Sequence, residues 1–242
     1  MKKTKQILCI QSICRRKEIM KKHYGPNEQV LKHIETITQG KRVLELGPGN
    51  TPFKNATDFI GWEHGVQPID KGSNYKVCDF NHHSLPYGDK EFDFVYCRHV
   101  LEDLIYPFRV MNEMQRIAKA GYIETPSPMA EIKKGIDGGD PEWRGYHHHV
   151  WYVWVYNNKL QFTKKYPISE YFGGIQEDNL QTFLENTPHG WNTYFLWQDS
   201  FDYELYQHGA DFYLTKDYNK FICTKVLDQA MKSTEEFYDK TK

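Results

Sequence analysis

The chain has 242 residues and a formal net charge of −1, with 31 basic and 32 acidic side chains. This length suits one domain with elaborations, and the balanced charge argues against nucleic acid or an anionic membrane as a partner. The five cysteines form no C-x-x-C pair and no apolar run approaches the ~20 residues of a membrane span, so we expect free thiols and a cytoplasmic protein.

Helix and strand patterns alternate along the first half of the chain. We expect residues 1–40 to form an N-terminal helical segment, with start signals at Pro26 and Asn27 and a stop signal at Gly40. Strands are predicted at Arg42–Leu46, Asp58–Glu63, Tyr75–Phe80, Phe92–Cys97 and Tyr122–Pro126, and a helix at Pro107–Ala118. No two-residue hairpin turn joins these strands, which predicts an α/β fold with a doubly wound, mostly parallel, Rossmann-like sheet.

The second half of the chain changes in character, because aromatic and β-branched residues dominate it. Residues 140–170 are predicted to contain an antiparallel hairpin that turns at Asn157 and Asn158 and covers the ligand cleft. A second antiparallel pair is predicted around Gln198–Ser200, and the final stretch STEEFYDKTK is expected to be polar and frayed. We expect residues 41–242 to form one domain.

A glycine-rich turn directly follows the first predicted strand. Glu45 lies on that strand, and Gly47 and Gly49 flank Pro48, so a ligand can approach the main chain closely there. Pro52 stands where a dinucleotide-binding motif has its third glycine, and no Gly-Lys-Ser/Thr of a phosphate-binding loop follows. An ordinary strand-to-helix turn is the alternative interpretation of this stretch.

Polar residues also follow the other predicted strands. In open parallel sheets, ligands bind outside the carboxyl ends of the strands. Glu63 and Asp79 are found there, after the second and third strands, and Arg98 and His99 follow the fourth. Carboxylates at successive strand ends suit a ligand that carries ribose hydroxyls and an adenine amine, because both groups donate hydrogen bonds.

Together, three stretches resemble a known family of enzymes. VLELGPG, VCDFNHHSLPYGDKEFDFVYCRHVLEDL and GYIETPS, within residues 41–127, resemble class I S-adenosylmethionine-dependent methyltransferases of the broad bacterial methyltransferase-11-like group. The resemblance implies a methyltransferase domain over residues 41–242. It also implies S-adenosyl-L-methionine as the cofactor and S-adenosyl-L-homocysteine as its product.

The resemblance also implies roles for individual residues. Expected around the cofactor are Glu45, Gly47, Pro48 and Gly49 at the methionine part, Glu63 at the ribose, Asp79 and Phe80 at the adenine, and the backbone of Cys97 at the sulfonium. For the chemistry, an oxygen or nitrogen atom of a small-molecule or sugar-type acceptor would take the methyl group by in-line displacement. His99 and His149 are the candidate general bases, since imidazole titrates near neutral pH. The oligomeric state stays open.

The chain departs from the family pattern at the turn after Gly49. Pro52 interrupts the helix expected there, so that helix must be short or missing, and Trp62 could take the place of Glu63. A non-catalytic binding protein with a degenerate cofactor cleft is therefore an alternative function. A nicotinamide-dependent oxidoreductase is a third interpretation, which Pro52 disfavours.

Each candidate also has a purely structural interpretation. Asp79 could cap a turn with Asn81, His99 could cap a helix, and Cys97 could be a small packing residue. The aromatic run after His149 is typical of a core sheet face. No metal site is predicted, because adjacent histidines such as those at 147–149 point to opposite faces when the chain is extended.

Overall fold

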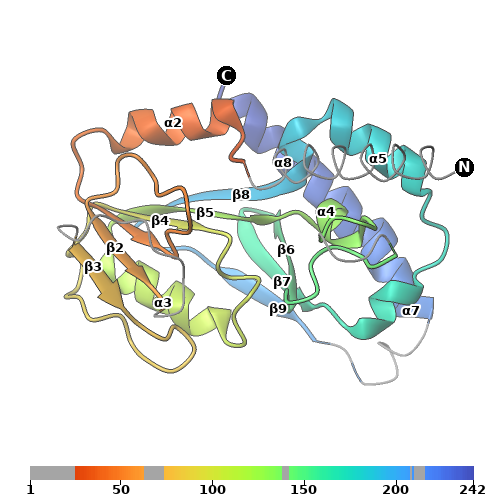
Figure 1. Cartoon of the computed structure of the whole chain (residues 1–242), viewed down its shortest axis with the longest axis horizontal. Helices are drawn as coiled ribbons and strands as arrows, with labels where there is room; N and C mark the ends of the chain where they lie inside the picture. The colour runs from red at the N-terminus through yellow and green to blue at the C-terminus, as the bar shows by residue number, and fades with distance from the viewer. Residues whose placement is uncertain (1–24, 63–73, 138–141, 208, 210–215) are drawn as a thin grey trace, which may run out of the picture.

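A computed structural model describes residues 25–62, 74–137, 142–207, 209 and 216–242, and the expected helix before residue 25 lies outside them. Its main feature is a six-stranded sheet with the strand order β3-β2-β1-β4-β5-β8 (Figure 1). The strands are β1 (Val43–Leu46), β2 (Asp58–Gly61), β3 (Asn74–Val77), β4 (Phe94–Arg98), β5 (Ala120–Pro126) and β8 (Asn192–Gln198). The first five run parallel and β8 is antiparallel to β5, which confirms the predicted mostly parallel sheet.

A smaller mixed sheet lies beside the large one, with the order β6-β7-β9. Strands β6 (Trp151–Tyr156) and β7 (Lys159–Lys164) form the predicted antiparallel hairpin. Its turn residues Asn157 and Asn158 have φ angles of 50° and 57°, which asparagine tolerates. Strand β9 (Tyr203–Tyr206) pairs with β7 in parallel.

Side chains alternate between the two faces of the large sheet, as strand geometry requires. On β4, Phe94 and Tyr96 belong to one core cluster, whereas Val95 and Cys97 belong to another. Both faces are covered, so the central strands read as continuous apolar runs.

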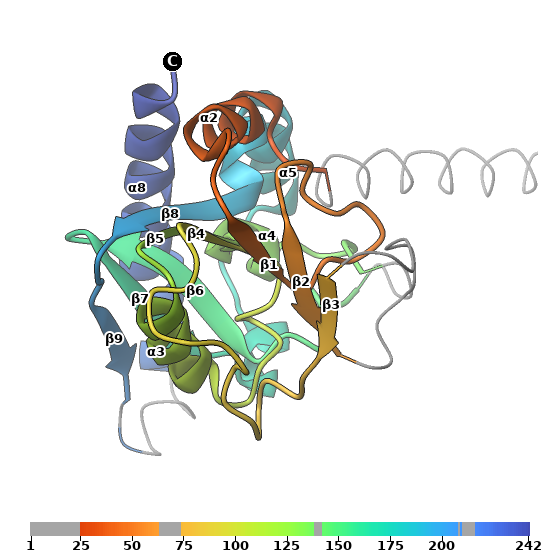
Figure 2. The ribbon, with the colours of Figure 1, turned by 90° about the vertical axis from the view of Figure 1, so that its left-hand side faces the viewer.

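Helices cover each face of the sheet (Figure 2). On one face lie α2 (Glu28–Thr38) and the end of α8 (Leu227–Lys240), and on the other lie α3 (Pro107–Ile117) and the small sheet. The remaining helical segments are α4 (Pro128–Ile132), α5 (Glu177–Asn186), α7 (Lys216–Lys220), the 3₁₀ turns η1 (Pro167–Tyr171) and η2 (Pro188–Trp191), and the π-helical η3 (Phe221–Val226).

Two predictions about the second half of the chain are wrong. Strands β8 and β9 do not form a hairpin: only an isolated bridge joins Gln198 to Ser200, and the two strands enter different sheets. The C-terminal stretch is helical and not frayed, because Phe237 and Tyr238 pack against the core that α2 also covers. The prediction that the helix after Gly49 is short or missing is confirmed, because a loop connects β1 to β2.

Candidate functional site

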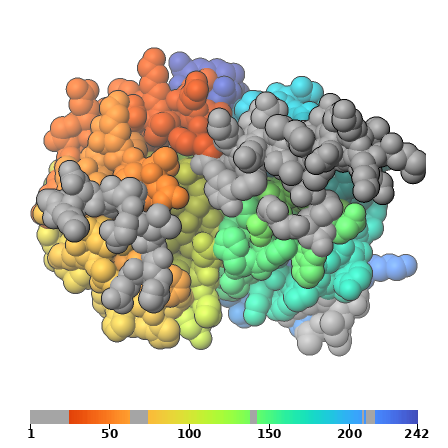
Figure 3. Space-filling view, viewed as in Figure 1, coloured from red at the N-terminus to blue at the C-terminus, as the bar shows by residue number. Residues whose placement is uncertain are grey.

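A cavity of about 780 Å³ opens beside the loop after β1. Its lining includes Glu45, Gly47 and Gly49, as well as Tyr96, Arg98 and His99 from the carboxyl end of β4. Pockets of about 300–1,000 Å³ are typical of small-molecule sites, and the carboxyl edge of a parallel sheet is where such sites lie. Figure 3 shows the red-to-yellow first half of the chain and the green-to-cyan part of the second half side by side on one face.

Glu45 is a buried carboxylic acid on the wall of this cavity. Its side chain accepts a hydrogen bond from the backbone N–H of Phe53 at 2.8 Å. Burial raises the pKa of Glu45 to about 7, although this hydrogen bond and the nearby Arg98 guanidinium both favour the ionised form. A ligand cation beside Glu45 would therefore meet a carboxylate that still lacks full compensation for its burial.

The two glycines of the turn differ in their surroundings. Gly47 has a φ angle of +65°, and a Cβ atom at this position would lie 2.6 Å from Val100 Cγ2. At Gly49 a Cβ atom would meet no protein atom within 4 Å, and the space beside it belongs to the cavity. Gly47 is thus required by the fold itself, whereas Gly49 keeps the main chain open toward the cavity.

The loop between β1 and β2 is held in place although it contains no helix. The ring of Phe53 stacks on Tyr96 with a centroid distance of 4.2 Å and an interplanar angle of 4°. Asn55 donates hydrogen bonds to Glu35 O and to Thr38 Oγ1 near the end of α2. These contacts fix the wall of the cavity, and the sequence showed no pattern that predicts them.

His99 and Arg98 form the β4 side of the cavity with Glu124 of β5 behind them. Arg98 Nε donates to Glu124 Oε1 at 3.1 Å, and His99 Nδ1 lies 3.2 Å from Glu102 Oε1. Burial, reinforced by the Arg98 charge, lowers the pKa of His99 to about 3. His99 is therefore neutral at physiological pH and a weak base. No helix begins at this residue, so the predicted helix-capping alternative is wrong.

The residues expected at the adenine lie apart from the first cavity. Asp79 lines a second cavity of about 530 Å³ together with Trp62, and the lining residues of the two cavities do not overlap. Asp79 accepts a hydrogen bond from the backbone of Asn81 at 2.9 Å, as the turn-capping alternative predicted. Phe80 is buried in the core, and Glu63 lies outside the described residues.

Cys97 is completely buried on β4 and packs in the core cluster behind the sheet. Burial raises the pKa of its thiol well above the usual range, so the thiol stays protonated. The predicted packing role is confirmed for the side chain.

His149 belongs to a second group of buried charges, close to the end of β4. Its Nδ1 lies 2.5 Å from Glu131 Oε1, and Lys165 Nζ lies 2.5 Å from the other oxygen of the same carboxylate. Burial alone would lower the pKa of His149, but the carboxylates of Glu131, Glu102 and Asp103 outweigh it and raise that pKa. His149 is held toward its protonated form, which is the opposite of His99.

The acids of the loop after β4 titrate closer to neutrality than their usual range. Burial raises the pKa of Glu102 to about 7 and that of Asp103 to about 6. Glu102 and Glu131 were not singled out from the sequence, although Glu102 lies in the HVLEDL end of the family-like stretch. Glu131 belongs to no recognised motif. An acidic residue inside an otherwise apolar segment, as in SPMAEI, is the only sequence signal for Glu131.

Two large polar or aromatic side chains of the second half, which could otherwise contact a methyl acceptor, have largely structural surroundings. Arg144 is buried and pairs with Glu177 at 2.6 Å, so it is not available to recruit an anionic acceptor. Trp151 is buried and donates from Nε1 to Leu104 O at 2.8 Å. These contacts support the interpretation of the aromatic run as core.

Histidines 147–149 do not form an extended segment, although the sequence-based prediction of no metal site assumed that they do. His147 and His148 lie in a turn before β6. His147 pairs with Asp137 at 3.7 Å, whereas His148 and His149 both approach Asp103. Two of the three rings therefore converge on one carboxylate.

Within the described ranges, none of the helices has the length and apolar character needed to cross a bilayer.

Comparisons with known proteins bear on the identity of this fold. Residues 53–123 match the family model described as a methyltransferase domain. The structure is similar to an S-adenosylmethionine-dependent methyltransferase from Mesorhizobium loti, with 15% identity, a TM-score of 0.36, and coverage of 68% of this chain and 72% of that one. No curated protein matches the chain.

Two further solved structures are similar over a smaller part of the chain. A SAM-dependent methyltransferase from Thermotoga maritima has 18% identity and a TM-score of 0.33, and the match covers 48% of this chain and 56% of that one. The YcgJ protein of Bacillus subtilis has 16% identity and a TM-score of 0.30, with 42% and 52% covered. The chain thus spans little more than half the length of these two proteins. The family match, to a methyltransferase domain, is confined to residues 53–123, which run from the loop after β1 into β5.

Proposed function

We propose that this chain transfers a methyl group from S-adenosylmethionine to an oxygen or nitrogen atom of a small-molecule acceptor, with sugars among the candidates. The observation that carries the proposal is the buried Glu45 beside Gly49, on the wall of a cavity at the carboxyl ends of β1 and β4. The cofactor would supply the electrophilic methyl group on a sulfonium cation. The protein's task would be alignment of the two reactants and exclusion of water.

The residues present fit the methionine part of this cofactor. Its ammonium group would give the buried Glu45 carboxylate the cationic partner that its raised pKa calls for. The open side of Gly49 allows the ligand to lie against the backbone, and no phosphate-binding lysine is needed for a cation. Glu45, Gly47, Pro48 and Gly49 are the proposed residues at this end.

The adenosine part would extend toward the ends of β2 and β3. Asp79 and the half-exposed Trp62 border the second cavity there, and an acid and an aromatic ring are suitable partners for an adenine. Glu63 and Phe80 remain proposed members of this part of the site, and the backbone at Cys97 is proposed to face the sulfonium.

Acid–base chemistry in this site would not rest on one histidine with a pKa near neutrality. Neutral His99, on the cavity wall, can accept a hydrogen bond from an acceptor N–H or O–H and orient its lone pair. His149, in contrast, is held toward its protonated form and would stabilise negative charge on the acceptor side. We propose these two as the catalytic histidines, with alignment as the larger contribution.

The experiment that tests this function is calorimetric titration of the full chain with S-adenosylhomocysteine, followed by methyl-transfer assays on a panel of small hydroxyl and amine acceptors, including sugars. We expect a dissociation constant on the order of micromolar, which corresponds to a binding free energy of about −8 kcal/mol. No binding by a folded sample would contradict the proposal and favour the non-catalytic alternative with a degenerate cofactor cleft. A thermal shift with NAD alone would favour the oxidoreductase.

A further inference from the structure

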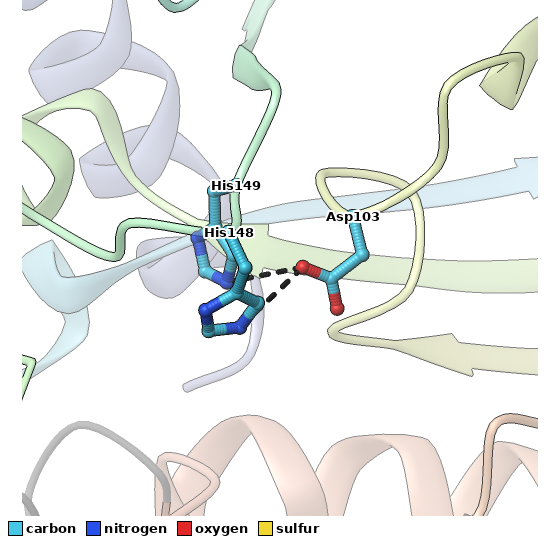
Figure 4. Close-up of side chains that lie close together, drawn as sticks. All are labelled: Asp103, His148 and His149. Atoms are coloured by element: carbon cyan, nitrogen blue, oxygen red, sulfur yellow. Dashed lines mark ion pairs between the residues drawn. The ribbon is translucent and has the colours of Figure 1, made fainter. Parts of the chain in front are cut away.

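Three potential metal ligands from two separate loops come together near the carboxyl end of β4. Asp103 lies between β4 and α3, and His148 and His149 lie just before β6 (Figure 4). One ligand atom from each of the three residues lies within 4.8 Å of the other two. The two rings face the same carboxylate, as Figure 4 shows.

The distances within this group are too long for hydrogen bonds and suit a shared cation. His149 Nε2 lies 3.5 Å from Asp103 Oδ1, and His148 Nε2 lies 3.6 Å from the same oxygen. Nitrogen and oxygen ligands of a tetrahedral zinc ion are about 3.4 Å apart, given zinc–ligand bonds of about 2.0–2.2 Å. Direct N–H···O hydrogen bonds are about 2.7–3.2 Å long.

The surrounding residues orient His149 in the manner typical of metal-binding histidines. Such a histidine usually donates its other ring N–H to a carboxylate, which fixes the ring and its tautomer. Glu131 takes this position, 2.5 Å from His149 Nδ1, and Lys165 holds Glu131 from the other side. The Nε2 atom is thereby directed at Asp103. Gly145 supports the arrangement, since a Cβ atom there would lie 2.5 Å from the Glu131 backbone oxygen.

His148 supplies the adjustable part of the group. Its side chain is 60% exposed, so its ring can rotate to close the ligand set at little cost. The side chain of His149 is only 6% exposed and is fixed. A buried ligand, a carboxylate whose side chain is 38% exposed and an exposed outer ligand leave room for a fourth, exchangeable position.

We propose that Asp103, His148 and His149 bind a divalent transition-metal ion, with zinc as the best match. The ion would displace the proton that His149 holds in the metal-free protein and supply the positive charge there instead. This His₂-carboxylate set leaves the fourth tetrahedral position for water or for an oxygen atom of a bound molecule. The site is linked to the first cavity through the loop after β4, in which His99 contacts Glu102. The proposal does not depend on methyl transfer by this chain.

The test is titration of the chelator-treated, full-length protein with Zn²⁺, and separately with Co²⁺ while the visible spectrum is recorded. We expect one equivalent of Zn²⁺ to bind, and the intense visible absorption of tetrahedral Co²⁺ to develop with the same stoichiometry. His148→Ala and Asp103→Asn should each weaken binding at least tenfold. His148 is exposed, so its replacement should leave the melting temperature of the metal-free protein unchanged.

His147→Ala is the matched control, because His147 adjoins the group but faces Asp137. This variant should bind Zn²⁺ and Co²⁺ as the parent does. Equal losses in His147→Ala and His148→Ala would mean that the histidine run binds metal unspecifically at the surface, which overturns the proposal. Absence of stoichiometric binding by the parent overturns it as well. Titration of the same preparations with S-adenosylhomocysteine tests the proposed function separately.

Discussion

At the scale of single residues, the two glycines of the loop after β1 offer a matched pair of substitutions. Gly47→Ala forces a side chain into a left-handed conformation and against Val100, so we expect a loss of roughly 1–3 kcal/mol in the unfolding free energy of the ligand-free protein. Gly49→Ala meets open space, so its ligand-free stability should stay near that of the parent.

The affinity for S-adenosylhomocysteine should fall in Gly49→Ala, the variant whose stability is expected to stay unchanged. The added methyl group at Gly49 would enter the volume of the ligand, and affinity should fall at least about tenfold, or 1.4 kcal/mol. Chemical unfolding and calorimetric titration on the same preparations measure both quantities. If Gly49→Ala binds as tightly as the parent, nothing lies against this turn, and the proposed cofactor position loses its main support.

Glu45 predicts a specific dependence of cofactor affinity on pH. Its pKa is about 7 in the ligand-free protein, but the ammonium group of S-adenosylhomocysteine needs the ionised carboxylate. Affinity should therefore rise with pH below 7, by up to about tenfold per unit, and level off above it. Glu45→Gln should bind more weakly and lose this dependence. An identical pH profile in parent and variant would show that Glu45 does not contact the amine.

Glu45 also makes the unfolding free energy depend on pH, but this quantity falls as pH rises, whereas the cofactor affinity increases. The pKa of Glu45 lies above its usual value of 4.5, so between pH 4.5 and 7 the folded chain holds a proton that the unfolded chain has lost. The contribution of Glu45 to the unfolding free energy therefore falls as pH rises through this window, by on the order of 3 kcal/mol. Relative to the parent, Glu45→Gln should gain stability near pH 8. The Glu45 carboxylate would thus serve ligand binding although it lowers the stability of the fold.

At the scale of elements, local sequence signals were reliable where the chain itself determines the conformation. Asn27 caps α2 by accepting from the backbone of Gln29 and Val30, and Gly40 follows the helix with a φ angle of 72°. The Asn157–Asn158 turn and all five parallel strands also lie where their patterns predicted. Such signals act over a few residues, so no knowledge of the fold is needed.

Pairing between distant elements could not be predicted in this way. The pattern of β9 indicates a strand but not its partner, and a tight turn at Asp199, with a φ angle of 61°, resembles a hairpin turn. In the fold, β8 closes the large sheet and β9 continues to the small one. The terminal helix did have a missed signal, since Leu227, Ala230 and Thr234 recur at helical spacing and the last two are buried.

The candidate site also has features that local sequence signals predict and features that depend on contacts between distant elements. Glu45, Gly47, Gly49 and His99 were predicted from their positions at strand ends, and they do line one cavity. The opposite protonation tendencies of His99 and His149 depend on which charges the fold places beside each ring. Sequence spacing holds no information about those neighbours.

At the scale of the whole molecule, one core joins the parallel sheet to the smaller sheet. Leu44 of β1 and Val95 of β4 belong to the same buried cluster as Val153 of β6 and Phe162 of β7. Chain segments that are more than 50 residues apart thus share a single interior. Residues 41–242 were predicted from the sequence to form one domain, and we expect them to unfold as one cooperative unit.

The positions of the tryptophans allow a direct test of this expectation. Trp151, Trp154, Trp191 and Trp197 are buried in the second half of the chain, whereas the proposed cofactor cavity is formed by residues of the first half. In a Trp62→Phe background, which removes the tryptophan at the second cavity, fluorescence therefore reports on a part of the molecule that lines neither proposed cofactor cavity. Far-ultraviolet circular dichroism reports on all helices and strands.

In one cooperative unit, S-adenosylhomocysteine must stabilise both signals equally. At a ligand concentration of 100 times the dissociation constant, the unfolding free energy should rise by about 2.7 kcal/mol in fluorescence and in circular dichroism alike. A shift in circular dichroism with an unchanged fluorescence midpoint would show that the halves unfold separately. Gly49→Ala is the control, because its weaker binding should shrink both shifts together while its ligand-free midpoints stay with those of the parent.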